Sequence, residues 1–118
     1  MIFKGITKDF SLMNEDQYNT IGAFLDEMTI KYGLENLVGL GYKWQNGMIS
    51  YAIGLKQGDI EDHNIVIDLP VDEWEIAYGK TDELKEIYDE IYKRGPLAME
   101  IELFFENGDC EIRYLRKK

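Results

Sequence analysis

Residues 96–118 read PLAMEIELFFENGDCEIRYLRKK, and the fold expected for the whole chain follows from this stretch. Two runs of alternating residues flank Asn107-Gly108, a dipeptide favoured in two-residue type I′ turns, so we predict a β-hairpin. A two-residue turn would pair Phe105 with Cys110. Both residues belong to the apolar face of the hairpin, and we expect a helix to cover that face.

The opposite face of the same strand carries two carboxylates, Glu100 and Glu102, between Ala98 and Phe104. The two-residue turn would place Glu102 opposite Arg113, an ion-pair partner, and would leave Glu100 without one. A carboxylate that lies beside another carboxylate and is removed from water has a raised pKa. Glu100 is therefore the candidate acid of a buried or half-buried site.

The chain upstream repeats the order of elements found at the C-terminus. Its first half reads as a strand, a helix and a hairpin closed by Asn46-Gly47, and this Asn-Gly pair lies 61 residues before the second one. Two such units in one short chain indicate duplication around a pseudo-twofold axis. We predict one α+β domain over residues 1–118. Its two β-α-β-β repeats, at about 1–56 and 64–118, would form antiparallel sheets and two helices around a central cleft.

The first predicted hairpin is poor in side chains where the second carries charge. A two-residue turn would pair Gly39 with Gly54 and Gly41 with Ala52, which leaves space along one face. The repeat makes this face equivalent to the carboxylate face, so we predict a groove with small residues on one side and Glu100, Glu102 and Phe104 on the other. The alternative is a solvated, acidic sheet face on which the glycines mark bulges.

Two aromatic residues outside the second hairpin are candidates for the wall of such a groove. Trp74 is flanked by acidic residues in DEWEIAYG, and indole faces attract ammonium and guanidinium groups. Tyr51 lies in the first hairpin and offers a second ring. The alternative for Trp74 is ordinary packing in the core or at its edge.

Composition excludes several classes of function. The formal net charge is −10, from 13 basic and 23 acidic residues, and would repel a phosphate backbone, so nucleic-acid binding is not expected. The charge suits a cationic ligand or a basic protein partner, or serves solubility alone. With one cysteine and one histidine we expect no disulfide framework, metal site or cofactor. No apolar run is long enough to span a membrane and no signal peptide is visible, so we expect a cytoplasmic protein.

Several stretches together resemble the GyrI-like small-molecule-binding domain, the effector-binding module of bacterial AraC-type and MerR-type transcription regulators. They are YAIGL, IDLPVDEWEIAYGKT and MEIELFFENGDCEIRYLRKK, and the resemblance extends over nearly the whole chain. It implies an α+β fold whose central cleft binds lipophilic, often cationic compounds. It gives Glu100 the role of the cleft carboxylate, although Met99 and Ile101 replace the usual aromatic neighbours.

The sequence starts directly in the first predicted strand, so it resembles the stand-alone form of the domain, and we expect no DNA-binding segment before it. It implies a protein that sequesters small molecules or modulates a partner such as DNA gyrase. We expect the ligand to meet Glu100, Glu102, Tyr51, Trp74 and Phe104. One alternative is a hydrolase of reactive electrophiles that uses Glu100 as general base, as some stand-alone relatives do. A second is an acidic module that docks a basic protein.

Overall fold

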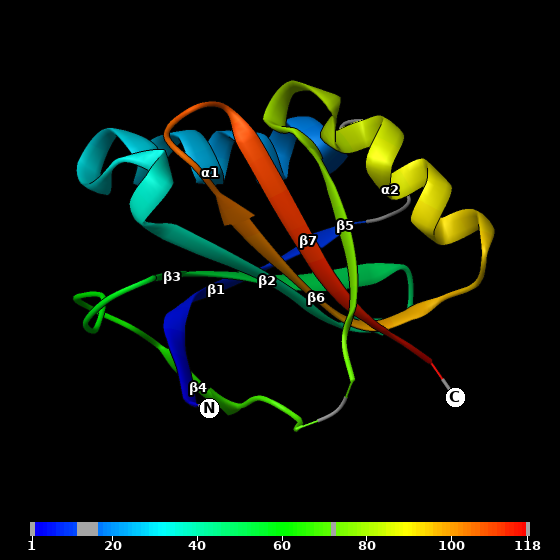
Figure 1. The fold of residues 1–118 in the computed structure, drawn as a ribbon. Helices are drawn as coiled ribbons and strands as arrows, with labels where there is room; N and C mark the ends of the chain where they lie inside the picture. The colour runs from blue at the N-terminus through cyan, green and yellow to red at the C-terminus, as the bar shows by residue number, and fades with distance from the viewer. Residues whose placement is uncertain (1, 12–16, 72, 118) are drawn as a thin grey trace.

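The protein was analysed as a computed structural model, which describes residues 2–11, 17–71 and 73–117. These residues form seven strands in one antiparallel sheet with two helices on one side (Figure 1). The helices are α1 (Gln17–Tyr32) and α2 (Leu84–Lys93), and single 3-10 turns follow α1 and precede α2. The strands are β1 (Ile2–Ser11), β2 (Leu37–Gln45), β3 (Met48–Leu55), β4 (Ile65–Asp68), β5 (Glu75–Lys80), β6 (Leu97–Phe104) and β7 (Asp109–Arg116).

The strand order β4-β1-β3-β2-β6-β7-β5 contains a symmetric core. Strands β1, β3 and β2 on one side of the centre correspond to β5, β7 and β6 on the other, as the predicted duplication requires. The two halves join through the antiparallel pair β2–β6, in which Gly39 lies opposite Glu102 and Gly41 opposite Glu100. The predicted α+β class is confirmed, and the glycine and carboxylate faces are adjacent strips of one continuous sheet.

The first hairpin has the predicted turn but not the predicted register. Asn46 and Gly47 both adopt positive φ, 54° and 73°, as a type I′ turn requires. A bulge at Lys43, with φ 59°, then shifts the pairing by one residue, so that Gly41 lies opposite Tyr51. The predicted pairs Gly41–Ala52 and Gly39–Gly54 are therefore wrong.

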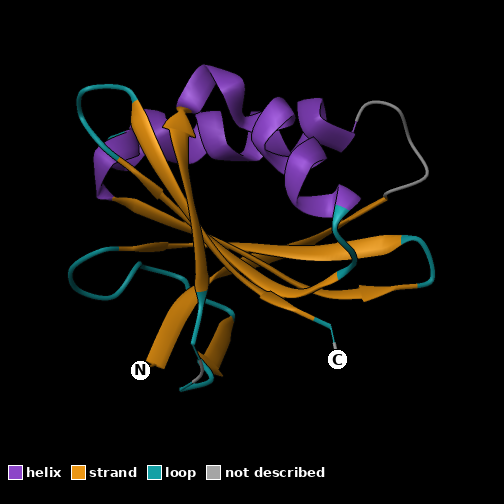
Figure 2. Ribbon diagram, turned by 45° about the vertical axis from the view of Figure 1, so that its right-hand side comes forward, coloured by secondary structure: helices purple, strands orange, loops and turns teal. Residues whose placement is uncertain are grey.

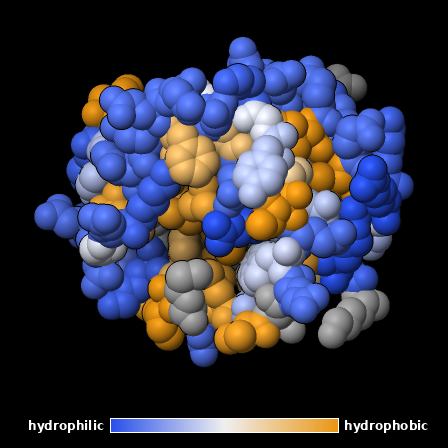
Figure 3. Space-filling model, in the orientation of Figure 1, coloured by the Kyte–Doolittle hydropathy of each residue, from blue (hydrophilic) through white to orange (hydrophobic). Residues whose placement is uncertain are grey.

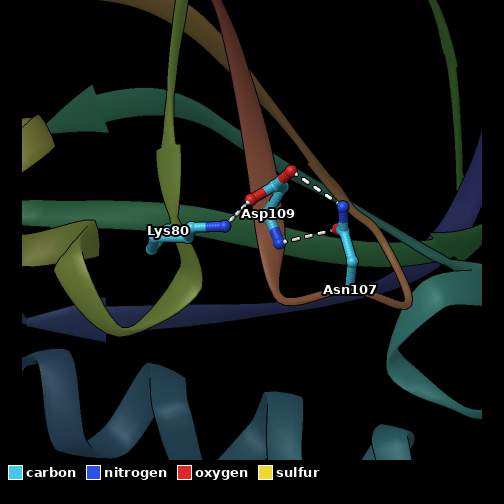
Figure 4. A network of polar contacts seen from close by, with 3 residues as sticks. All are labelled: Lys80, Asn107 and Asp109. Carbon is cyan, nitrogen blue, oxygen red and sulfur yellow. Dashed lines mark hydrogen bonds and ion pairs between the residues drawn. The ribbon is translucent and has the colours of Figure 1, made fainter.

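The second hairpin has a longer loop than predicted. The N–H of Gly108 donates to Phe105 O at 3.0 Å, and Gly108 adopts φ 89°, which adds a residue to the turn. Pairing begins at Phe104–Cys110 rather than Phe105–Cys110, so Glu102 faces Ile112 and not Arg113. In Figure 4 the loop is closed by hydrogen bonds between Asn107 and Asp109, at 2.9 and 3.1 Å. Lys80 of β5 pairs with Asp109 in the same network.

Both faces of the central sheet are covered, and on β6 the helices lie over the carboxylate face, opposite to the face predicted for that strand. Both helices lie over one face of the sheet (Figure 2). Glu100, Glu102 and Ile112 are on that face, while Ile101 belongs to the cluster on the other face. Strand β4 contributes Ile65 and Ile67 to that second cluster, and the segment that follows it contributes Leu69 and half-buried Trp74. Because the apolar side of β6 packs here, the prediction that a helix covers it is wrong.

The surface is mostly hydrophilic on the face seen in Figure 3, where hydrophobic side chains form an interrupted strip among polar ones. This distribution fits the formal charge of −10. Among the described residues, neither helix combines the length and the hydropathy that crossing a membrane requires.

Candidate ligand-binding site

A cavity of about 420 Å³ lies between the two helices and the centre of the sheet. A volume of this order accommodates a small organic molecule. Most of its wall is apolar or aromatic, and two carboxylates of β6 form its acidic part. The lining residues come from α1, β2, β3, α2, the segment between α2 and β6, β6 and the segment after β7, and they are Ile21, Gly22, Leu25, Trp44, Ile49, Tyr51, Leu84, Tyr88, Tyr92, Pro96, Leu97, Glu100, Glu102 and Lys117.

Of the two carboxylates, Glu102 has the more complete set of hydrogen bonds, because tyrosine hydroxyl groups donate to both of its oxygens. Its side chain is 4% exposed. Tyr51 of β3 donates its hydroxyl proton to Oε1, and Tyr88 of α2 donates to Oε2 at 2.6 Å. Burial raises the pKa of Glu102, and the two tyrosine hydrogen bonds oppose that rise.

Glu100 lies two residues earlier on the same face and is equally buried, at 4% exposure. It has one hydroxyl donor, Tyr92 of α2, at 3.2 Å from Oε2. Burial is the main reason why its pKa lies well above the ordinary value of 4.5, the charge of Glu102 adds to the rise, and the Tyr92 hydrogen bond opposes it. The sequence predicted a raised pKa for Glu100, and this environment shifts the pKa in the same direction.

The glycines of β2 provide the room that both carboxylates occupy. A Cβ atom at Gly41 would lie 2.6 Å from Glu100 Oε1, and one at Gly39 would lie 2.8 Å from Glu102 Oε1. Any larger residue at either position would collide with a carboxylate. The lack of side chains at these two glycines therefore makes room for the two carboxylates of the neighbouring strand. The space predicted beside the glycines is filled by these acidic side chains.

Aromatic rings form much of the wall around these carboxylates. Tyr88 and Tyr92 stack on each other at a centroid distance of 5.9 Å, because residues four apart share one face of α2. Tyr51 meets Phe24 of α1 edge-on at 6.5 Å. Burial and the nearby carboxylates raise the pKa of Tyr51 and Tyr88, so both hydroxyls keep their protons and act as donors.

The two carboxylates of the cavity have no ion-pair partner in the described part of the chain. Neither Glu100 nor Glu102 forms an ion pair with a described lysine or arginine. Arg113, the partner expected for Glu102, pairs with Glu111 at 2.5 Å. Lys117 lines the cavity without pairing with either carboxylate. No group of three or more acidic, histidine or cysteine side chains among the described residues is arranged to hold a metal ion.

Three of the five residues expected at the site line this cavity, namely Glu100, Glu102 and Tyr51. Phe104 is fully buried beside Glu102 on β6 and lies outside the lining. Trp74 packs on the opposite face of the sheet, where its indole N–H donates to Pro70 O at 3.3 Å. The role of each residue in ligand binding stays a prediction.

The sequence reasoning missed the contribution of α2. Tyr88 and Tyr92 fit the helical spacing of core residues, and neither was among the residues expected to meet the ligand. The available signal was chemical, because two hydroxyl groups on the buried face of a helix need acceptors, and the sheet beneath offers two carboxylates. Trp44 also lines the cavity and was not among the residues expected at the site.

No protein-family model and no curated protein sequence matches this chain. Two solved structures match over 99% of it, each with 17% sequence identity and a TM-score of 0.66. One is SAV2435 bound to tetraphenylphosphonium, of which 88% is covered. The other, with 93% covered, is a candidate bacterial transcription regulation protein from Staphylococcus aureus MU50. The chain therefore shares its fold with these proteins, and the resemblance to the GyrI-like family stays a prediction.

Proposed function

We propose that this protein binds lipophilic organic cations in the cavity between its helices and sheet. The observation that carries the proposal is the pair of buried carboxylates, Glu100 and Glu102, that lies in an aromatic-lined cavity without an ion-pair partner among the described residues. In biological terms it would sequester such compounds or modulate a partner, as effector-binding domains of bacterial regulators do.

The energetics of the cavity favour a guest that is both apolar and positively charged. Negative charge in a poorly hydrated site is costly unless a cation or hydrogen-bond donors compensate it. Apolar and aromatic side chains, such as Trp44 and Leu84, supply contact for a hydrophobic body. A neutral guest would leave the charge uncompensated, and an anion would be repelled.

The fold neighbour SAV2435 supports this choice of ligand class, because tetraphenylphosphonium is an apolar cation without hydrogen-bond donors. We therefore use tetraphenylphosphonium as the probe. We do not carry over the contacts of that complex, because 17% identity leaves the individual site residues open.

The test is calorimetric titration of the protein with tetraphenylphosphonium, comparing wild type with Glu100→Gln. We expect saturable binding, weakened at least about tenfold by the substitution, which corresponds to about 1.4 kcal/mol. Glu111→Gln is the matched control, because it removes another buried carboxylate of the same sheet that does not line the cavity. Equal affinity in wild type and Glu100→Gln, or equal weakening by both substitutions, would contradict the proposal.

A second candidate function is hydrolysis of reactive electrophiles with Glu100 as general base. The specific observation in its favour is a carboxylate of raised pKa with a tyrosine hydroxyl at 3.2 Å, an arrangement suited to proton transfer. Turnover of a strained electrophile that disappears in Glu100→Gln would support it. Binding of such compounds without turnover leaves the first proposal as the function.

A further inference from the structure

The two carboxylates of the cavity differ in how fully their charge is satisfied. Glu102 accepts hydrogen bonds from Tyr51 and Tyr88, one on each oxygen. Glu100 accepts one hydrogen bond, from Tyr92 to Oε2, and this bond is longer. Hydrogen bonds stabilise the ionised form of a carboxylate, so Glu102 is the better placed to remain charged.

Two carboxylates on one strand face, two residues apart, disfavour double ionisation when both are buried. Strand β2 puts only Gly39 and Gly41 beside them, so no side chain of that strand stands between the charges. Lining residues of the described part of α1 are Ile21, Gly22 and Leu25, which carry no charge. The titratable or charged groups that face Glu100 from the packed elements are Glu102 of β6, Tyr51 of β3, Tyr88 and Tyr92 of α2, Tyr114 of β7 and, beyond β7, Lys117.

We propose that Glu100 carries a proton while the cavity is empty and releases it to water when an organic cation enters. The O–H bond of the Glu100 carboxyl group breaks, the proton leaves for bulk solvent, and the carboxylate left behind faces the guest. Each guest thus exchanges one proton for one positive charge. The inference rests on the proposed function, because it describes how the same site accepts its ligand.

This exchange keeps the charge of the site constant, and it defines the ligand class more narrowly. With Glu102 ionised throughout, the empty cavity holds one negative charge, and the filled cavity holds two carboxylates and one cation. A singly charged guest therefore suits the site better than a doubly charged one.

Burial raises the pKa of Glu100, so the exchange operates above the ordinary pKa of 4.5. Below the raised pKa the affinity falls about tenfold for each pH unit, since deprotonating Glu100 costs that much more.

The experiment is calorimetric titration of the full chain with tetraphenylphosphonium from about pH 5 to about pH 9, in pairs of buffers with different ionisation enthalpies. Below the pKa of Glu100 we expect release of about one proton per bound cation, declining to none above it. Over the acidic part of that range the affinity should rise with pH. Glu102→Gln should retain the proton release, because Glu100 is still buried and still exchanges its proton.

A second measurement follows the carboxyl group of Glu100 directly, first without ligand and then with it. Carbon-13 spectra of glutamate-labelled protein, with Glu100 assigned by its loss in Glu100→Gln, should show its carboxyl group titrating above 4.5. Adding tetraphenylphosphonium should shift this signal to the ionised position. Binding without proton release, or an ordinary Glu100 titration, overturns the exchange and leaves the binding function intact. Absence of tetraphenylphosphonium binding at every pH overturns the proposed function and the exchange together.

Discussion

The two central hairpins, β2–β3 and β6–β7, occupy equivalent places in the symmetric strand order but contribute opposite things to the cavity. Strand β2 offers Gly39 and Gly41, which contribute room, and β6 offers Glu102 and Glu100, which contribute charge. Neither contribution would form the site alone. The strand order supplies a symmetric frame, and the difference between two glycines on β2 and two glutamates on β6 makes the centre of that frame an asymmetric acidic cavity.

The helices show the same division between the halves. Described residues of α1 that line the cavity, such as Leu25, are apolar, whereas α2 places the hydroxyl groups of Tyr88 and Tyr92 on the carboxylates. Tyr51 is the one hydroxyl donor from the first half in this network as described. Most of the polar chemistry therefore belongs to the second half, and the first half provides space and apolar surface.

The largest expected effect comes from filling the room that β2 provides. In Gly39→Ala the new methyl group would collide with the Tyr51 hydroxyl group and lie 2.8 Å from Glu102 Oε1. Overpacking and the loss of a buried, charge-assisted hydrogen bond should together lower the free energy of unfolding by about 3 kcal/mol. Urea denaturation followed by circular dichroism measures this change.

Gly22→Ala is the matched control for that substitution, because it adds the same methyl group to another wall of the cavity. No atom lies within 4 Å of the added Cβ, and the position is inside α1. Alanine should stabilise the helix by about 0.5–1 kcal/mol. If both substitutions change stability equally, the close fit between β2 and the carboxylates is not what limits position 39.

Two tyrosine substitutions test the difference between the carboxylates. Tyr88→Phe removes a buried hydrogen bond of 2.6 Å to Glu102 and should cost about 2 kcal/mol of unfolding free energy. Tyr92→Phe removes a bond of 3.2 Å from a side chain that is 37% exposed, and should cost less than about 1 kcal/mol. Urea denaturation of both variants at one pH measures the two losses of unfolding free energy. A larger loss of stability for Tyr92→Phe would mean that hydrogen bonding stabilises Glu100 more than Glu102, contrary to our assignment.

Much of this fold could be predicted because its signals are periodic and local. Alternating residues and the dipeptides at Asn46 and Asn107 indicated both hairpins, and the spacing between them indicated duplication. Register was not predictable in the same way, because single residues outside the periodic pattern determine it. Lys43 forms a bulge and Gly108 extends a loop. In each hairpin, the cross-strand pairs farther from the turn are shifted by one residue as a result.

The candidate site was predictable only in part, for related reasons. Glu100 was singled out because the predicted register left it without an ion-pair partner, and in the observed register it lies opposite Tyr114, which is not a basic residue either. The partner assigned to Glu102 did depend on the loop and was wrong. Trp74 was placed beside the carboxylates, but a strand pattern of period two does not reveal which face lies under the helices when both faces are covered.

The pH dependence of stability gives the most graded test of the comparison between Glu100 and Glu102. Burial raises the folded-state pKa of Glu100 above its unfolded value, so its protonated form favours the folded protein. The stability that this group contributes is therefore complete below about pH 4.5 and is lost as the pH rises through the folded-state pKa. The loss amounts to about 1.4 kcal/mol for each pH unit between the two pKa values.

Urea denaturation at several pH values, for wild type and Glu100→Gln, isolates this contribution. The difference in unfolding free energy between the two proteins cancels the titration of the groups that they share. We expect the difference to shift in favour of Glu100→Gln as the pH rises and then to level off. A difference that is constant above pH 4.5 would mean that Glu100 ionises as readily in the folded protein as in the unfolded chain.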